Sequence, residues 1–121
     1  MDLLRAQTMR TRLNRHMDHF FGSYDLILTP SVPIAAFEAG HEVPPGSGMR
    51  DWMEWTPFSY PFNLTQQPAA SVPCGFTSAG LPIGLQIVGA RFEDARVLRA
   101  CRAYMNAFPP RFPERLNESR P

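Results

Sequence analysis

The stretch "AASVPCGFTSAGLPIGLQIVG", residues 69–89, decides the fold of this chain. It contains two apolar runs, separated by the short segment "TSAG". Two such runs joined by a short glycine-containing loop are typical of an antiparallel β-hairpin. Because side chains alternate along a strand, the second run has two faces. One face holds Ile83, Leu85 and Ile87, and the other holds Gln86 and Val88.

A helix is predicted on each side of the hairpin. Downstream, the spacing predicts a helix from about Glu93 to Phe108, whose apolar face holds Val97, Leu98, Cys101, Tyr104, Met105 and Phe108. Near the start of the chain, residues 3–21 carry an apolar stripe at three- and four-residue steps, formed by Ala6, Met9, Leu13, Met17 and Phe20. Gly22 is expected to end this first helix.

A third strand is predicted between the first helix and the hairpin. The run "YDLILTP" is short, apolar and closed by Pro30, which indicates a buried strand from Asp25 to Thr29. No regular helix or strand pattern follows, and the segment from Pro30 to Pro73 contains eight prolines. Only "MRDWMEWT", residues 49–56, favours a helical turn or two. A loop this long is either a binding loop or lid, or a segment whose packing surface is missing from the chain.

Together these elements predict one domain over residues 1–121, with a proline-rich tail at 109–121. The fold class is α/β to α+β: a small mixed sheet of about three strands, one strand plus an antiparallel hairpin, with flanking helices. Both outer strands have edges that can remain unpaired.

The composition restricts the chemistry of the chain. All twelve cationic side chains are arginine, so no lysine amine is present to act as a base, and arginine does not release its proton. The net charge of +1 argues neither for nor against nucleic acid or membrane partners, and we predict neither. Cys74 and Cys101 are isolated, which predicts reduced thiols in a cytoplasmic protein. The apolar runs are too short to span a bilayer.

Several residues are of types that can carry out chemistry, but neither their spacing nor a known motif supports a site. His16 and His19 are three residues apart on the first helix, but the spacing suggests no third ligand, so we predict no metal and no cofactor. A Ser-His-Asp site could be assembled from His41, Asp51 and either Ser59 or Ser71, yet no nucleophile motif supports it. Cys74 is interpreted as a small buried packing residue.

Three segments resemble the C-terminal end of amidase signature family enzymes. They are "YDLILTPSVP" at 24–33, "YPFNLTQQPAASVPCGF" at 60–76 and "GLPIGLQIVGARFEDARVLRA" at 80–100. The resemblance implies a slice of the amidase signature fold. It also implies amide hydrolysis or transfer by a Ser–cis-Ser–Lys triad, in which a neutral lysine accepts a proton through the bridging serine. Neither the lysine nor the Gly/Ser-rich signature is present in these 121 residues.

The resemblance implies a place near the substrate for one part of the loop. Trp55, Thr56, Phe58, Tyr60 and Asn63 would line the pocket, or would only brace a proline-rich loop. We expect the Asn63 amide to hold backbone groups between the tryptophan loop and the hairpin. In amidotransferase A subunits an aspartate near the position of Thr56 holds the substrate ammonium, so an uncharged threonine favours an apolar or aromatic amide over glutamine.

Two hypotheses of function remain open. The chain is a C-terminal fragment of an amidase-like enzyme, folded but inactive alone, or a free-standing binding or scaffold module derived from that fold. The expected partners are a second copy of the chain, giving a homo-oligomer, or the missing N-terminal amidase part. A small-molecule amide would bind only in the full-length enzyme.

Overall fold

The computed structural model describes residues 2–112. Its elements are α1 (Leu3–Phe21), β1 (Leu26–Pro30), the 3-10 helix η1 (Trp52–Trp55), α2 (Tyr60–Thr65), β2 (Ala69–Phe76), β3 (Pro82–Gly89) and α3 (Asp94–Ala107). The predicted helices, strand and hairpin are therefore confirmed, with small shifts at their ends. Residues 109–112 of the predicted tail have no regular structure, and the remainder of that tail lies outside the described residues.

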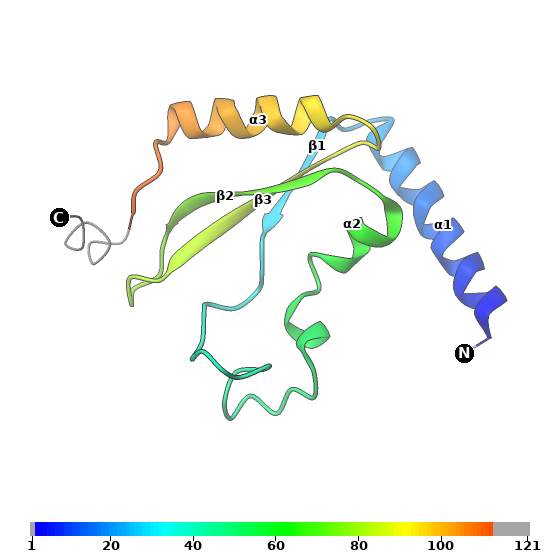
Figure 1. Cartoon of the computed structure of the whole chain (residues 1–121). Helices are drawn as coiled ribbons and strands as arrows, with labels where there is room; N and C mark the ends of the chain where they lie inside the picture. The colour runs from blue at the N-terminus through cyan, green and yellow to red at the C-terminus, as the bar shows by residue number, and fades with distance from the viewer. Residues whose placement is uncertain (1, 113–121) are drawn as a thin grey trace.

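The three strands form one sheet in the order β1-β3-β2 (Figure 1). Both pairings are antiparallel, whereas a mixed sheet was predicted. Leu28 of β1 lies opposite Ile87, and Val72 of β2 lies opposite Leu85, which makes β3 the central strand. Within residues 2–112, the outer edges of β1 and β2 pair with no further strand.

The core lies between the sheet and α3, which packs along β2 and β3 (Figure 1). It consists of Val72, Ile87, Val97 and Cys101. A Cβ atom at Gly89 would lie 2.7 Å from the Val97 side chain, so glycine is needed where the helix crosses the end of β3. The predicted apolar face of α3 is only partly correct, because Leu98 and Phe108 are exposed.

β1 is an edge strand with no fully buried residue, which corrects the prediction of a buried strand. Leu28 shares the face of Ile87 but remains 61% exposed, because α3 covers the other two strands. At the start of the strand, the Asp25 carboxylate accepts a hydrogen bond from the Arg96 guanidinium of α3. Arg96 also pairs with Glu93 at 3.3 Å, so this side chain connects β1 to the beginning of α3.

The segment between β1 and β2 lies on the side of the sheet opposite α3 (Figure 1). It contains η1, as predicted, and also α2, which was not predicted from the sequence. Pro61 falls in the first turn of α2, where its missing N–H breaks no helical hydrogen bond. The helix ends at Gln66, which adopts a left-handed conformation with φ 61°.

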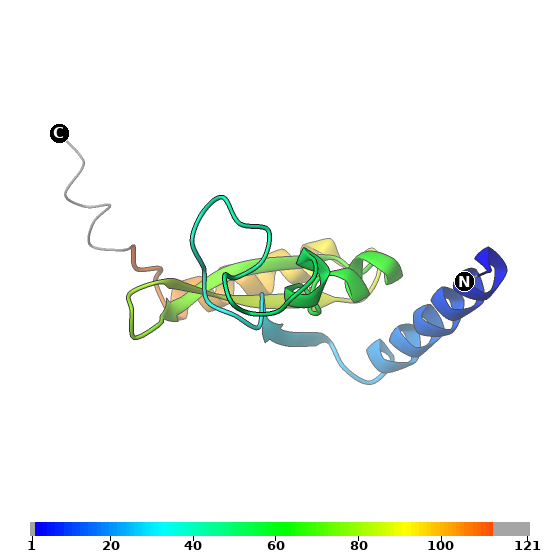
Figure 2. The ribbon, with the colours of Figure 1, turned by 90° about the horizontal axis from the view of Figure 1, so that it is seen from below.

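α1 extends away from the sheet, as both views show (Figure 2). Its N-terminus is capped by the Asp2 carboxylate, which accepts a hydrogen bond from the Leu4 N–H at 3.3 Å. The Arg10 Nε donates to the Leu64 carbonyl oxygen at 2.8 Å and holds α1 against α2. None of the residues of α1 is buried, so the predicted apolar stripe has little to pack against.

Candidate functional site

Gln86 connects the sheet to the segment that contains the predicted pocket residues. Its side chain is buried on the β3 face that points away from α3. The Nε2 atom donates to the Phe58 carbonyl oxygen at 2.8 Å and to the Thr29 hydroxyl at 3.0 Å. A buried amide with two acceptors fixes the position of the backbone that it binds, so residues around Phe58 have a defined position over the sheet.

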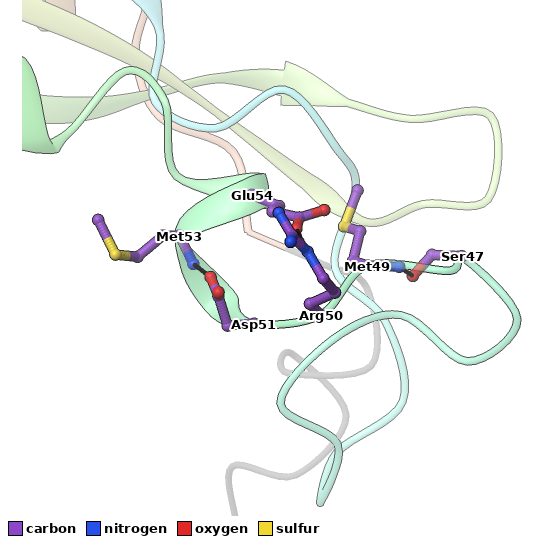
Figure 3. A network of polar contacts seen from close by, with 6 residues as sticks. All are labelled: Ser47, Met49, Arg50, Asp51, Met53 and Glu54. Carbon is purple, nitrogen blue, oxygen red and sulfur yellow. Dashed lines mark hydrogen bonds and ion pairs between the residues drawn. The ribbon is translucent and has the colours of Figure 1, made fainter.

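The segment that precedes Phe58 is held by polar contacts between residues that are close in the sequence (Figure 3). The Asp51 carboxylate accepts from the Met53 N–H at 2.9 Å and begins η1. Arg50 Nε donates to Glu54 Oε1 at 2.9 Å, and this hydrogen bond raises the pKa of the guanidinium further. The Ser47 hydroxyl accepts from the Met49 N–H at 3.3 Å. The loop is therefore shaped by its own residues as well as by the sheet.

The five predicted pocket residues differ in their surroundings. Thr56 is buried, and its hydroxyl donates to the Trp52 carbonyl oxygen at 3.2 Å. Trp55 donates its indole N–H to the Glu42 carbonyl oxygen at 2.9 Å and meets Phe37 edge-on, with ring centroids 5.6 Å apart. Phe58 and Tyr60 are half-buried. Their role as pocket lining stays a prediction.

Asn63 does not behave as expected. Its side chain is exposed and makes no hydrogen bond with another described residue, so it does not hold backbone groups near the hairpin as predicted. The backbone explains this result, because α2 places position 63 on its solvent side. Gln86, which was predicted only to lie on one face of a strand, makes the connection that was expected of Asn63.

An open depression of about 790 Å³ lies at the other end of the hairpin. It is lined by Pro73, Cys74, Gly75, Phe76, Tyr104, Ala107, Phe108, Pro109, Pro110 and Arg111. None of the five predicted pocket residues contributes to it. Cys74 is exposed there, with its Sγ 3.5 Å from the Ile83 carbonyl oxygen, which corrects its interpretation as a buried packing residue.

Two serines that are distant in sequence meet over the central strand. The hydroxyl oxygens of Ser31 and Ser71 are 2.5 Å apart. They lie over Gly84, where a Cβ atom would come within 2.6 Å of both oxygens. Among the described residues, no ionisable side chain forms a hydrogen bond with either hydroxyl. The pair therefore lacks a base that could accept its proton.

The Ser-His-Asp arrangement considered above does not form. Ser71 is paired with Ser31, the Asp51 carboxylate caps η1, and His41 lies 3.8 Å from Glu38. Within residues 2–112, no three His, Cys, Asp or Glu side chains gather into a possible metal site. No helix in the same range has the length and apolar character needed to cross a membrane.

Comparison with known proteins connects this architecture to one family. The family model described as Amidase matches residues 1–98. The glutamyl-tRNA(Gln) amidotransferase A-subunit from Myxococcus xanthus is 44% identical over 101 residues, which cover 84% of this chain and 20% of that relative. Its counterpart from Brevibacillus brevis is also 44% identical, over 83% of this chain and 20% of its own length.

Solved structures of amidases contain the same arrangement. The amidotransferase A-subunit from Thermotoga maritima superposes with a TM-score of 0.71 and 34% identity, over 87% of this chain and 22% of its own. A bacterial aryl acylamidase of the amidase signature family gives a TM-score of 0.74 and 30% identity, over 95% of this chain and 24% of its own. The chain spans about a fifth of the length of the curated relatives it matches. Its sheet, its flanking helices and the match over most of its length show that the chain belongs to the amidase family.

Proposed function

We propose that this chain is a non-catalytic, C-terminal part of an amide-cleaving enzyme of the amidase family, and that it does not hydrolyse amides alone. One observation carries the proposal. The chain contains a pair of hydrogen-bonded serines, Ser31 and Ser71, but no lysine and no other base bonded to that pair among the described residues.

The chemistry explains why this observation matters. A serine hydroxyl attacks an amide carbonyl only when a neighbouring base removes its proton. Arginine cannot act as that base, because its pKa stays above about 12. His41, a residue that could, lies beside Glu38 and makes no hydrogen bond to either serine. The proposed catalytic groups therefore belong to a polypeptide segment outside these 121 residues.

The part that this chain would play is to brace one wall of the substrate pocket. Gln86 holds the backbone at Phe58, and the neighbouring side chains of Trp55, Thr56 and Tyr60 are then available to that wall. Thr56 carries no charge, and its hydroxyl already donates a hydrogen bond to a backbone carbonyl oxygen. This position offers no carboxylate to pair with a substrate ammonium, which supports an apolar or aromatic amide as the substrate of the whole enzyme.

The second candidate is a free-standing binding or scaffold module. The open depression beside Cys74 and Tyr104 favours it, because this surface is separate from the predicted pocket wall. A reading frame directly upstream that encodes a lysine and a Gly/Ser-rich segment would support the enzyme part over the module. We place either form in the cytoplasm, because both cysteines are free thiols.

An activity assay tests the main proposal. The purified 121-residue chain is expected to show no turnover on a panel of aliphatic and aromatic amides. Ser59→Ala, Ser71→Ala and Cys74→Ala variants serve as controls for contaminating hydrolases, because a contaminant is unaffected by them. Turnover that persists through further purification and is abolished by one of these substitutions would refute the proposal.

A further inference from the structure

The outer edge of β1 carries backbone groups that no other strand of residues 2–112 pairs with. Just beyond the end of β1, the Ser31 N–H donates to the Gly84 carbonyl oxygen at 2.9 Å, so Ser31 points its polar backbone atoms toward β3. This direction alternates from residue to residue along an antiparallel strand. The backbone groups of Leu26, Leu28 and Pro30 therefore point away from β3, toward the outer edge.

A hydrogen bond on the other side of the sheet gives the same alternation. The Gly89 N–H on the central strand donates to the Pro68 carbonyl oxygen at 3.0 Å, so Gly89 points toward β2. Leu26 lies opposite Gly89 in the register of β1 with β3, and its own backbone groups must therefore point outward. The outer edge thus offers the N–H donors of Leu26 and Leu28 together with the carbonyl oxygens of Leu26, Leu28 and Pro30.

β1 lacks most of the features that protect a free sheet edge. Its sequence, "LILTP", contains no charged residue, and its register with β3 has no bulge. β2 differs, because this strand is bulged between Pro73 and Gly75. Charged side chains, prolines and bulges discourage pairing between sheet edges, and β1 has only Pro30 at its last position. The edge of β1 is therefore more open to a further strand than the edge of β2.

The exposed side chains of β1 lie on one face of this edge. Leu28 lies opposite Ile87 and shares its face, which is the face covered by α3. Leu26 and Pro30 take the same face, because side chains alternate along a strand. Leu26 packs against the core, whereas Leu28 is 61% exposed and Pro30 is also exposed. A partner strand would therefore cover Leu28 best with an apolar side chain of its own.

We propose that this edge pairs with the same edge of a second copy of the chain, so that Leu28 lies opposite the partner's Leu28. The two strands run antiparallel about a twofold axis, and each Leu28 N–H donates to the carbonyl oxygen of the partner's Leu28. Each Leu26 N–H donates to the carbonyl oxygen of the partner's Pro30. The Thr29 hydroxyl also donates to the Pro30 carbonyl oxygen, at 2.9 Å, but a carbonyl oxygen has two lone pairs. The pairing joins two three-stranded sheets into one continuous sheet.

A second copy fits this edge well because the edge is complementary to itself. The copy places Leu28 against Leu28 and Leu26 against Pro30, so each exposed apolar side chain of β1 meets another. Residues 26–30 carry no charge and the net charge is only +1, so little repulsion opposes the contact. The inference does not rest on the proposed function, because an active and an inactive chain have the same free edge.

The exposed area of the chain leaves room for such an interface. The solvent-accessible surface is 9334 Å², whereas the area-to-mass relation for folded monomers gives roughly 6,600 Å². Even if the ten residues outside 2–112 are allowed the full area of an unfolded chain, roughly 1,800 Å², an excess of roughly 900 Å² remains. A standard interface buries about 800 Å² on each partner, so the excess is enough for one.

The experiment uses two opposite charges at the position that is expected to face itself. Leu28→Lys and Leu28→Glu each place like charges directly opposite one another in the pair. Met9→Lys is the matched control, because Met9 on α1 is 59% exposed against 61% for Leu28. Sedimentation velocity of the 121-residue chain is measured over a range of concentrations for the parent, for each variant and for an equimolar mixture of the two Leu28 variants. Circular dichroism checks that each variant keeps its fold.

The parent is expected to sediment as a dimer, with twice the monomer mass of 13.7 kDa. Leu28→Lys and Leu28→Glu should each weaken dimerisation by more than about tenfold, whereas Met9→Lys should not change it. The mixture should form the dimer again, because opposite charges then face each other. A parent that stays monomeric at every concentration, a dimer that Met9→Lys dissociates, or a mixture that does not restore the dimer would each overturn the inference.

Hydrogen exchange of the parent chain is a second measurement that needs no variant. The amide hydrogens of Leu26 and Leu28 point to the outer edge, so their exchange should slow as the concentration rises. Those of Ile27 and Thr29 point to β3 and should exchange at the same rate at every concentration. Exchange at Leu26 and Leu28 that does not depend on concentration would contradict the pairing, whether or not the Leu28 variants fold.

Discussion

The side-chain amide of Gln86 donates a hydrogen bond to the Phe58 carbonyl oxygen at 2.8 Å, across a sequence separation of 28 residues. Gln86 sits on the central strand, so its position is fixed on both sides by backbone pairing. Phe58 lies in an irregular segment that has no such pairing. This one buried side chain therefore holds the backbone of the predicted pocket wall to the sheet at Phe58.

Replacing Gln86 by leucine should destabilise the chain. The substitution leaves the Phe58 carbonyl oxygen and the Thr29 hydroxyl without their donor, which typically costs about 1–3 kcal/mol. Denaturant unfolding of Gln86→Leu should show this loss in the free energy of unfolding. Asn63→Leu is the matched control, because the exposed Asn63 side chain makes no hydrogen bond with a described residue, and it should stay within about 0.5 kcal/mol of the parent. An unchanged free energy of unfolding for Gln86→Leu would show that the hydrogen bond to the Phe58 carbonyl oxygen is dispensable.

Gly89 is expected to tolerate no side chain. A Cβ atom there would lie 2.7 Å from the Val97 side chain, so Gly89→Ala must push α3 away from the sheet and lose about 1–3 kcal/mol. Because the clash is with Val97, the loss should be smaller in a Val97→Ala background, as a double-mutant cycle would show. Additive effects of the two substitutions would contradict the proposed contact.

Gln66 offers a stabilising substitution. Its φ of 61° is costly for a residue with a side chain and free for glycine. Gln66→Gly should therefore raise the free energy of unfolding by about 0.5 kcal/mol, after the greater flexibility of the unfolded glycine is counted. Gln7→Gly, the same change inside α1, should instead lower it by up to about 1 kcal/mol. A lower free energy of unfolding for Gln66→Gly would mean that the Gln66 side chain makes contacts that outweigh the backbone strain.

The two cysteines should differ in reactivity. Cys74 is exposed and should react quickly with a thiol reagent at about pH 8, whereas Cys101 is buried in the core and should react only after unfolding. Equal rates for the two thiols in the folded chain would contradict their placement.

The pH dependence of stability follows from the same burial. Desolvation raises the pKa of the Cys101 thiol above its ordinary value of 9.0. The folded chain then holds this proton more tightly than the unfolded chain, so the thiol contributes stability in full below pH 9.0 and loses it as the pH rises through the raised value. A Cys101→Ala variant should lack this decline, which begins at about pH 9.

The features predicted correctly from the sequence depend on neighbours along the chain. The hairpin at 69–89 and the helix that begins near Glu93 are local patterns, and both are confirmed. The exposure of β1 could not be predicted, because a short apolar run looks the same at an edge and at the centre of a sheet. α2 was missed because its six residues include Pro61 and span less than two helical turns.

The arrangement of the site required knowledge of the strand order. Ser31 follows β1 and Ser71 lies on β2, and the two strands are neighbours only through β3. No spacing in the sequence predicts that their hydroxyls meet over Gly84. The Asn63 expectation failed for a related reason, since the missed helix α2 places that side chain in solvent.

The pairing of β1 with β3 also determines the order in which the chain can acquire structure. β1 is synthesised before its partner strand, which follows roughly sixty residues later, as the opposition of Leu28 and Ile87 shows. The hairpin and α3, by contrast, are contiguous and can assemble as soon as they are made. We therefore expect β1 to join the sheet last, because a long loop must close at an entropic cost before it pairs. Its amide hydrogens should exchange with solvent before those of the central strand, and a ribosome-bound chain should expose this apolar strand to chaperones throughout the delay.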